Sequence, residues 1–133
     1  MMQQDSIFTK IIKGEIPCHK VYEDEHTIAF LDIHPIQPGH TLVVPKKQVE
    51  VFTDLADEDA VALWASARKV ARRLSQVFPD KKRVALMIVG LDVDHAHIHL
   101  LPIDSEAEFR AKQDMTAEPN HAELAKIAEK LKI

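Results

Sequence analysis

Three histidines alternate with apolar residues in the segment His95-Ala96-His97-Ile98-His99, the part of the sequence best suited to chemistry. In a β-strand successive side chains point to opposite faces, so the three imidazoles would share one face, with neighbours about 6.7 Å apart. Such a row has three interpretations. It is a surface strand that happens to be rich in histidine, a metal site with imidazole ligands, or a site where one imidazole attacks phosphorus while its neighbours bind phosphate oxygens and manage protons. Chance alternation of so rare a residue is the least favoured, and the spacing leaves the other two open.

Hydrophobic periodicity predicts the elements that must position these histidines. Strict alternation predicts a strand over residues 95–103, and an apolar run predicts a buried strand over 83–89 that forms a hairpin with it. Apolar residues at helical spacing predict a long helix over 56–78. Its expected buried stripe comprises Ala60, Leu63, Trp64, Ala67, Val70, Ala71 and Leu74.

The remaining elements are shorter. Helices are predicted over 5–13, with Asp5 or Ser6 as the N-cap, and over 118–131; strands are predicted over 21–23, 27–31 and 40–45. Strands that follow one another, with helices set apart, predict an α+β fold. We expect a mainly antiparallel sheet of about five strands, one long helix and short terminal helices.

Composition narrows the class of protein. The 133 residues suit a single domain, 1–133, and the formal net charge of −4 makes a nucleic acid a poor candidate partner. Cys18 is the only cysteine, which excludes an intrachain disulfide. The longest apolar run, Val84 to Leu91, is too short to span a bilayer, and the first residues do not resemble a signal peptide. A cytoplasmic protein without membrane association is therefore expected.

The triad segment resembles the signature of the histidine triad (HIT) family, which has three alternating histidines followed by two apolar residues. Four earlier segments also resemble that family in the same order: 7–17 (IFTKIIKGEIP), 21–24 (VYED), 29–33 (AFLDI) and 38–47 (PGHTLVVPKK). The resemblance covers roughly residues 6–103. It leaves residues 104–133 as a C-terminal extension that contains the helix predicted over 118–131. It favours phosphorus chemistry over a metal site and implies no cofactor.

The resemblance implies roles for individual residues. His97 would attack the α-phosphorus of a nucleotide, and water would then hydrolyse the nucleotidyl-histidine intermediate. His99 would contact phosphate oxygens or the leaving group, His95 would shape the site, and His40 matches a fourth pocket histidine. Asp32 matches the acidic residue that binds the ribose hydroxyls. The apolar slot for the base would be formed by Phe8, Ile11, Ile16, Phe30, Ile33 and Leu42, each of which could equally be ordinary core.

These roles imply a hydrolase or nucleotidyl transferase acting on nucleoside 5′-monophosphate derivatives, such as phosphoramidates or nucleotidyl conjugates. A purine nucleotide as substrate and a homodimer are further implications of the resemblance. The alternatives are a diadenosine polyphosphate hydrolase and a nucleotide-binding regulatory protein with little turnover.

Two departures from the family pattern concern metal and substrate. Many bacterial members bind structural zinc through Cys-x-x-Cys and two histidines, whereas this chain has Ser6, Thr9 and Gln48 at three of those positions. Hydroxyl and amide groups are poor zinc ligands, so no structural zinc is expected. Before the triad, the Asn and the Gly-rich, Gln-bearing loop usual in the family are replaced by a short acidic link with Asp92 and Asp94. A carboxylate repels phosphate, so Asp92 would suit a cationic amine leaving group or indicate weak turnover.

Overall fold

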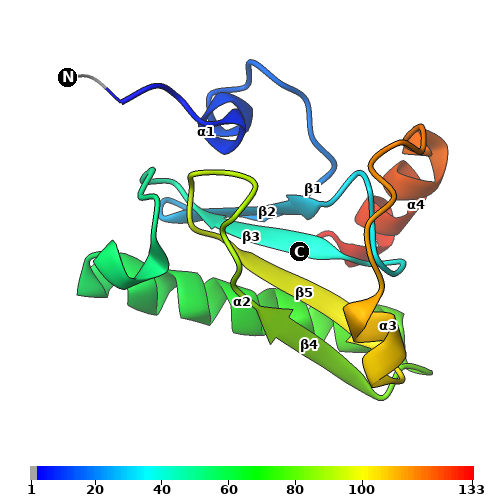
Figure 1. Ribbon diagram of the computed structural model, residues 1–133. Coiled ribbons are helices and arrows are strands. Elements are labelled where there is room, and N and C mark those ends of the chain that lie inside the picture. The colour runs from blue at the N-terminus through cyan, green and yellow to red at the C-terminus, as the bar shows by residue number, and fades with distance from the viewer. Residues whose placement is uncertain (1–2) are drawn as a thin grey trace.

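The computed structural model describes residues 3–133 and contains one antiparallel five-stranded sheet with the order β1-β2-β3-β5-β4 (Figure 1). The strands are β1 (Lys20–Glu23), β2 (Thr27–Leu31), β3 (Thr41–Pro45), β4 (Arg83–Met87) and β5 (Ile98–Ile103). Every neighbouring pair is antiparallel, and β4 and β5 are joined by residues 88–97. The predicted α+β class with about five strands is confirmed.

The two faces of the sheet are covered by different helices. The long helix α2 (Asp57–Val77) packs across β2, β3, β4 and β5, and α4 (His121–Leu131) packs beside it against β1 and β2. The short helix α1 (Ile7–Ile12) lies over the opposite face (Figure 1). Of the two predicted N-cap candidates, Ser6 is confirmed, since its hydroxyl accepts a hydrogen bond from the Thr9 amide. Two short helical elements were not predicted: η1 (Phe52–Asp54) and α3 (Glu106–Arg110).

Alternation along the strands divides the apolar side chains between two cores. Ala29 and Leu31 of β2 belong to the larger core, beneath α2 and α4. Ile28 and Phe30, from the same strand, belong to a smaller core beneath α1. The candidate site lies on this second side.

The apolar stripe of α2 is narrower than predicted. Leu63, Ala67, Val70 and Leu74 are buried as expected, but Ala60 is exposed and Trp64 is 56% exposed. The buried side of the helix includes Ser66 instead. Its hydroxyl shares a hydrogen bond of 2.7 Å with the Thr27 hydroxyl of β2. In the described residues, no helix has the length and apolar character that a membrane crossing requires.

The predicted strand over 95–103 is shorter in the structure. β5 begins at Ile98, where its pairing with Val43 of β3 ends. Upstream of this point the Ala96 amide donates to the Val49 carbonyl, outside the strand ladder. The alternation nevertheless continues, because Ala96, Ile98 and Leu100 are all buried.

Candidate active site

A cavity of about 330 Å³ lies between α1, the ends of β2, β3 and β5, and the β4–β5 loop. This volume is at the lower end of the range for small-molecule sites. Two of the four predicted catalytic histidines, His97 and His99, line the cavity, and His40 and His95 lie fully buried behind them. All the predicted nucleotide-binding residues also line it: Phe8, Ile11, Ile16, Phe30, Asp32, Ile33, Leu42 and Asp92.

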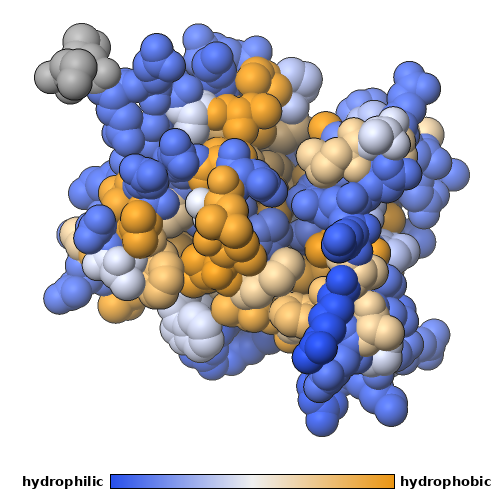
Figure 2. All heavy atoms as spheres, viewed as in Figure 1, coloured by the Kyte–Doolittle hydropathy of each residue, from blue (hydrophilic) through white to orange (hydrophobic). Residues whose placement is uncertain are grey.

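The sequence did not point to several other residues of the cavity wall. Gln113 and Met115 come from the segment between α3 and α4, outside the segments on which the sequence prediction of the site was based. Figure 2 shows hydrophobic side chains gathered near the centre of the view, in the region of α1 and the β4–β5 loop. The exposed apolar residues that line the cavity are Ile7, Ile33, Val89, Leu91 and Met115.

The protonation state of His97 follows from its backbone contact. Its Nδ1 lies 2.8 Å from the carbonyl oxygen of His95. A carbonyl can only accept, so Nδ1 carries the proton and Nε2 keeps its lone pair. Burial lowers the pKa of His97, although the His95 carbonyl and the charges of Asp32 and Asp92 oppose that effect. The ring is held edge-on against Phe8, with centroids 4.8 Å apart. His97 is therefore a neutral imidazole with a free nitrogen.

His95 supports this arrangement from inside the protein. Its Nε2 donates to the Pro45 carbonyl at 2.7 Å, so its Nδ1 accepts from the Ser6 hydroxyl at 2.7 Å. Burial lowers the pKa of His95. With both ring nitrogens bonded, His95 fixes the carbonyl that orients His97.

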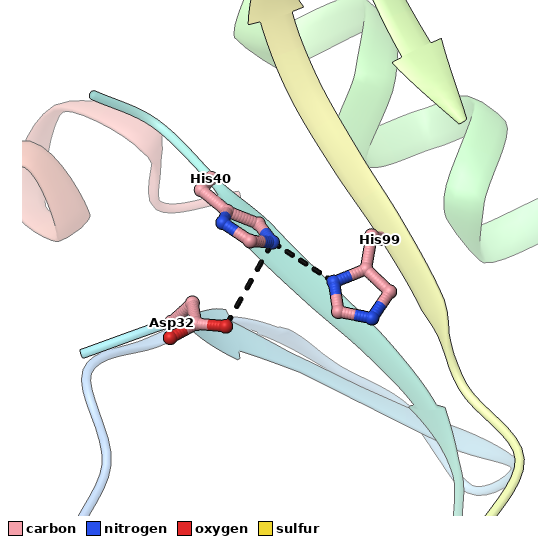
Figure 3. A group of neighbouring side chains, drawn as sticks. All are labelled: Asp32, His40 and His99. Atoms are coloured by element: carbon pink, nitrogen blue, oxygen red, sulfur yellow. Dashed lines mark hydrogen bonds and ion pairs between the residues drawn. The ribbon is translucent and has the colours of Figure 1, made fainter. Parts of the chain in front are cut away.

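His40 and His99 form a second hydrogen-bonded chain (Figure 3). The Ile36 amide donates to His40 Nδ1 at 3.1 Å, so the proton of His40 is on Nε2, which donates to His99 Nδ1 at 2.9 Å. The His99 proton is then on Nε2, where it is available as a donor to a phosphate oxygen. Gly39, with φ of +92°, makes the turn into His40, and a Cβ there would lie 2.8 Å from the Phe78 ring.

Burial keeps this pair neutral. It lowers the pKa of His40 to about 4, and the neighbouring His97 contributes to the shift. It also lowers the pKa of His99 to about 4, helped by His97 and His40 and opposed by Asp32 and Asp92. Neutral imidazoles at neutral pH can donate and accept hydrogen bonds without placing a row of positive charges in the core.

Asp32, His40 and His99 bring one potential metal-ligating atom each to within 4.8 Å of one another (Figure 3). A metal ion at His40 would need the lone pair of Nε2, but the Ile36 amide at Nδ1 places the proton there. Asp32 Oδ2 lies 3.8 Å from the same Nε2. The geometry therefore favours the hydrogen bond between His40 and His99 over a metal centre.

The three residues at the family's zinc positions do come together, with His95 as the fourth member. Thr9 Oγ1 donates to Gln48 Oε1 at 2.6 Å, and the Ser6 amide donates to the same oxygen at 2.8 Å. Two hydroxyls, an amide and one imidazole that already satisfy one another do not fit a zinc ion. The sequence identified three of these positions but not that His95 completes the set.

The two carboxylates of the acidic link before the triad, Asp92 and Asp94, lie in different environments. Asp92 lines the cavity together with His97 and His99, and its charge favours the protonated form of both. Asp94 is not among the lining residues. Of the two carboxylates, Asp92 is the one placed to meet a ligand.

Comparison with known proteins gives consistent results. A family model described as HIT domain matches residues 13–106. The chain is 42% identical over 99 residues to an uncharacterized HIT-like protein of Methanocaldococcus jannaschii, a match covering 72% of this chain and 77% of that protein. It is 36% identical over 104 residues to the adenosine 5′-monophosphoramidase of Schizosaccharomyces pombe, covering 75% of each. It is also similar to the crystal structure of a HIT-like protein involved in cell-cycle regulation from Bartonella henselae, with a TM-score of 0.82, 30% identity and coverage of 98% and 97% of the two chains.

Proposed function

The chain belongs to the HIT domain family, and from this premise we propose that it hydrolyses phosphoramidates of nucleoside 5′-monophosphates, with His97 as the nucleophile. The observation that carries the proposal is the tautomer of His97. Its Nδ1–H is bonded to the His95 carbonyl, so an unprotonated Nε2 remains on a ring that lines the cavity. A neutral, oriented imidazole is a competent nucleophile near pH 7.

The reaction would proceed in two displacements at phosphorus. In the first, Nε2 of His97 forms a bond to the α-phosphorus, the P–N bond to the leaving amine breaks, and the amine takes a proton from solvent. In the second, water attacks phosphorus, the bond to Nε2 breaks, and the proton is returned to solvent. The Nδ1–H of His97 stays on the His95 carbonyl throughout, which stabilises the positive charge on the ring of the intermediate. His99 would donate its Nε2–H to a phosphate oxygen.

The charge of the cavity supports an amine as the leaving group. Over residues 3–133, no lysine or arginine lines the cavity, whereas Asp32 and Asp92 do. A diadenosine polyphosphate would bring further negative charges that this wall cannot neutralise. Asp92 would instead accept a hydrogen bond from the departing amine. This favours phosphoramidase activity over diadenosine polyphosphate hydrolysis.

The test uses an adenosine 5′-phosphoramidate with a fluorescent amine as the leaving group, at neutral pH with excess chelator. We expect release of the amine by the wild type and a loss of at least 1000-fold in kcat for His97→Ala, because the nucleophile itself is removed. Mass spectrometry of the quenched wild type should detect a nucleotidyl adduct on His97. If the wild type binds AMP but releases no amine, the protein binds nucleotides without hydrolysing them. If amine is released only when the chelator is omitted, the reaction depends on a metal ion. Either result contradicts the proposal.

A further inference from the structure

The segment between α3 and α4 contributes one anchored residue to the cavity. Residues 110–118 are exposed at every position except Gln113, which is half-buried and lines the cavity. This segment lies beyond residues 13–106, the range that the family model matches. The attachment of this segment to the site therefore depends on contacts made outside the matched range.

Gln113 is attached to Asp32, 81 residues earlier in the chain. Its Nε2 donates to Asp32 Oδ2 at 2.8 Å and to the His34 carbonyl at 2.9 Å. Both partners can only accept, which identifies the amide nitrogen as the atom facing them. The other oxygen of Asp32, Oδ1, accepts from the His34 amide at 2.8 Å. The Asp32 carboxylate is thus held by one bond on each oxygen.

The remaining acceptor capacity of Asp32 matches a vicinal diol. Each carboxylate oxygen has two lone-pair positions, and each uses one within the protein, so one position per oxygen is left. Asp32 lines the cavity, and its side chain is 13% exposed. A carboxylate whose rotation is fixed by two donors loses little conformational entropy when a ligand binds.

We propose that Gln113 is a positioning residue for ribose recognition: its amide holds the Asp32 carboxylate so that the two free acceptor positions receive the 2′- and 3′-hydroxyls of a ribonucleotide. This inference rests on the proposed function, because it takes a nucleotide as the ligand. It makes the strap of residues 110–118 a specificity element for ribonucleotides over deoxynucleotides. Gln113 does not touch phosphorus, so its contribution is to binding and not to the chemical step.

The experiment measures the Kd of AMP and of 2′,3′-dideoxy-AMP by calorimetry for the wild type, Gln113→Ala and Glu118→Ala. Loss of one hydrogen bond to a charged group predicts roughly tenfold weaker AMP binding for Gln113→Ala and less than twofold for the dideoxynucleotide. Glu118 is exposed on the same strap, and its substitution should change neither value. In the phosphoramidate assay Gln113→Ala should raise KM with little change in kcat.

Gln113→Glu provides a second variant of nearly the same shape. It replaces the donor with a carboxylate that repels Asp32, so AMP binding should weaken more than for Gln113→Ala. Equal weakening of AMP and dideoxy-AMP would overturn the inference in favour of a merely structural strap. Tighter AMP binding by Gln113→Ala would overturn it by showing that Gln113 blocks the site. If the wild type binds no AMP, the proposed function itself is contradicted. If the wild type prefers AMP to dideoxy-AMP and Gln113→Ala has the same preference, only the role of Gln113 is contradicted.

Discussion

Ile98 and Leu100 of β5 point into the core beneath α2 and α4, whereas His97 and His99, their neighbours in sequence, face α1 and the cavity. The first pair belongs to the larger apolar core. The second pair consists of polar rings, each with its Nδ1 hydrogen-bonded to a specific partner and its Nε2 left for a ligand. One stretch of chain therefore serves two purposes, because alternate side chains meet different environments.

The difference lies in what each face contributes. Burial of Leu100 stabilises the fold, since apolar area is removed from water. Burial of the imidazoles opposes their protonation, which lowers the pKa of His40 and His99 to about 4. The imidazoles on the site side are therefore neutral and oriented at neutral pH, and the same low pKa values make the folded state less stable at acid pH. Substitutions on one face should change mainly stability, and substitutions on the other mainly turnover.

The largest effect is expected on the apolar face. Leu100→Ala should lower the free energy of unfolding by about 4 kcal/mol, because Leu100 is 1% exposed in a close-packed core. Its kcat per folded molecule should be unchanged. The matched variant His99→Gln, one residue away, should cut kcat with a much smaller loss of stability. Urea unfolding measures the stability of the two variants, and the phosphoramidate assay measures their kcat. Equal losses of stability in the two variants would contradict the difference proposed between the two faces.

The next effect is the pH dependence of stability. His40 binds a proton more weakly in the folded state, with a pKa of about 4, than in the unfolded chain, where it is near 6.5. The unfolded state therefore takes up protons first as pH falls. The contribution of His40 to stability should be constant above pH 6.5 and should decline between pH 6.5 and pH 4 by on the order of 3 kcal/mol.

Urea unfolding at a series of pH values measures this decline. His40→Asn retains an acceptor for the Ile36 amide but does not titrate, so its stability should fall less over the same range. If the wild type and His40→Asn declined in parallel, His40 would not be the neutral buried group that its contacts indicate.

The smallest effect concerns the support of the site. Ser6→Ala removes the N-cap of α1 and the donor to His95, and should cost about 1 kcal/mol of stability together with a few-fold loss in kcat. Ser105 caps α3 in the same way, away from the triad, so Ser105→Ala should lower stability without affecting kcat. A similar loss of kcat in both variants would show that Ser6 acts only through general stability.

Most secondary structure could be predicted because its signals are local. The N-cap at Ser6 and the alternation around the triad depend on neighbouring residues. The errors arose where distant contacts decided the outcome. Trp64 matched the apolar period of α2, yet burial of Ser66 against Thr27 turned it outward. The strand of the triad starts late because Ala96 bonds to Val49 instead of a strand partner.

By itself, the sequence determined the α+β class, the family and the placing of three imidazoles on one side of the chain, since each of these depends on local order and period. Tertiary structure decided which nitrogen of His95 and of His99 carries a proton, because their partners, the Pro45 carbonyl and the His40 ring, lie far from them in sequence. It also brought Gln113 to Asp32 across 81 positions. No local pattern encodes such pairings, because a hydrogen bond between distant segments exists only once the chain has folded and brought donor and acceptor together.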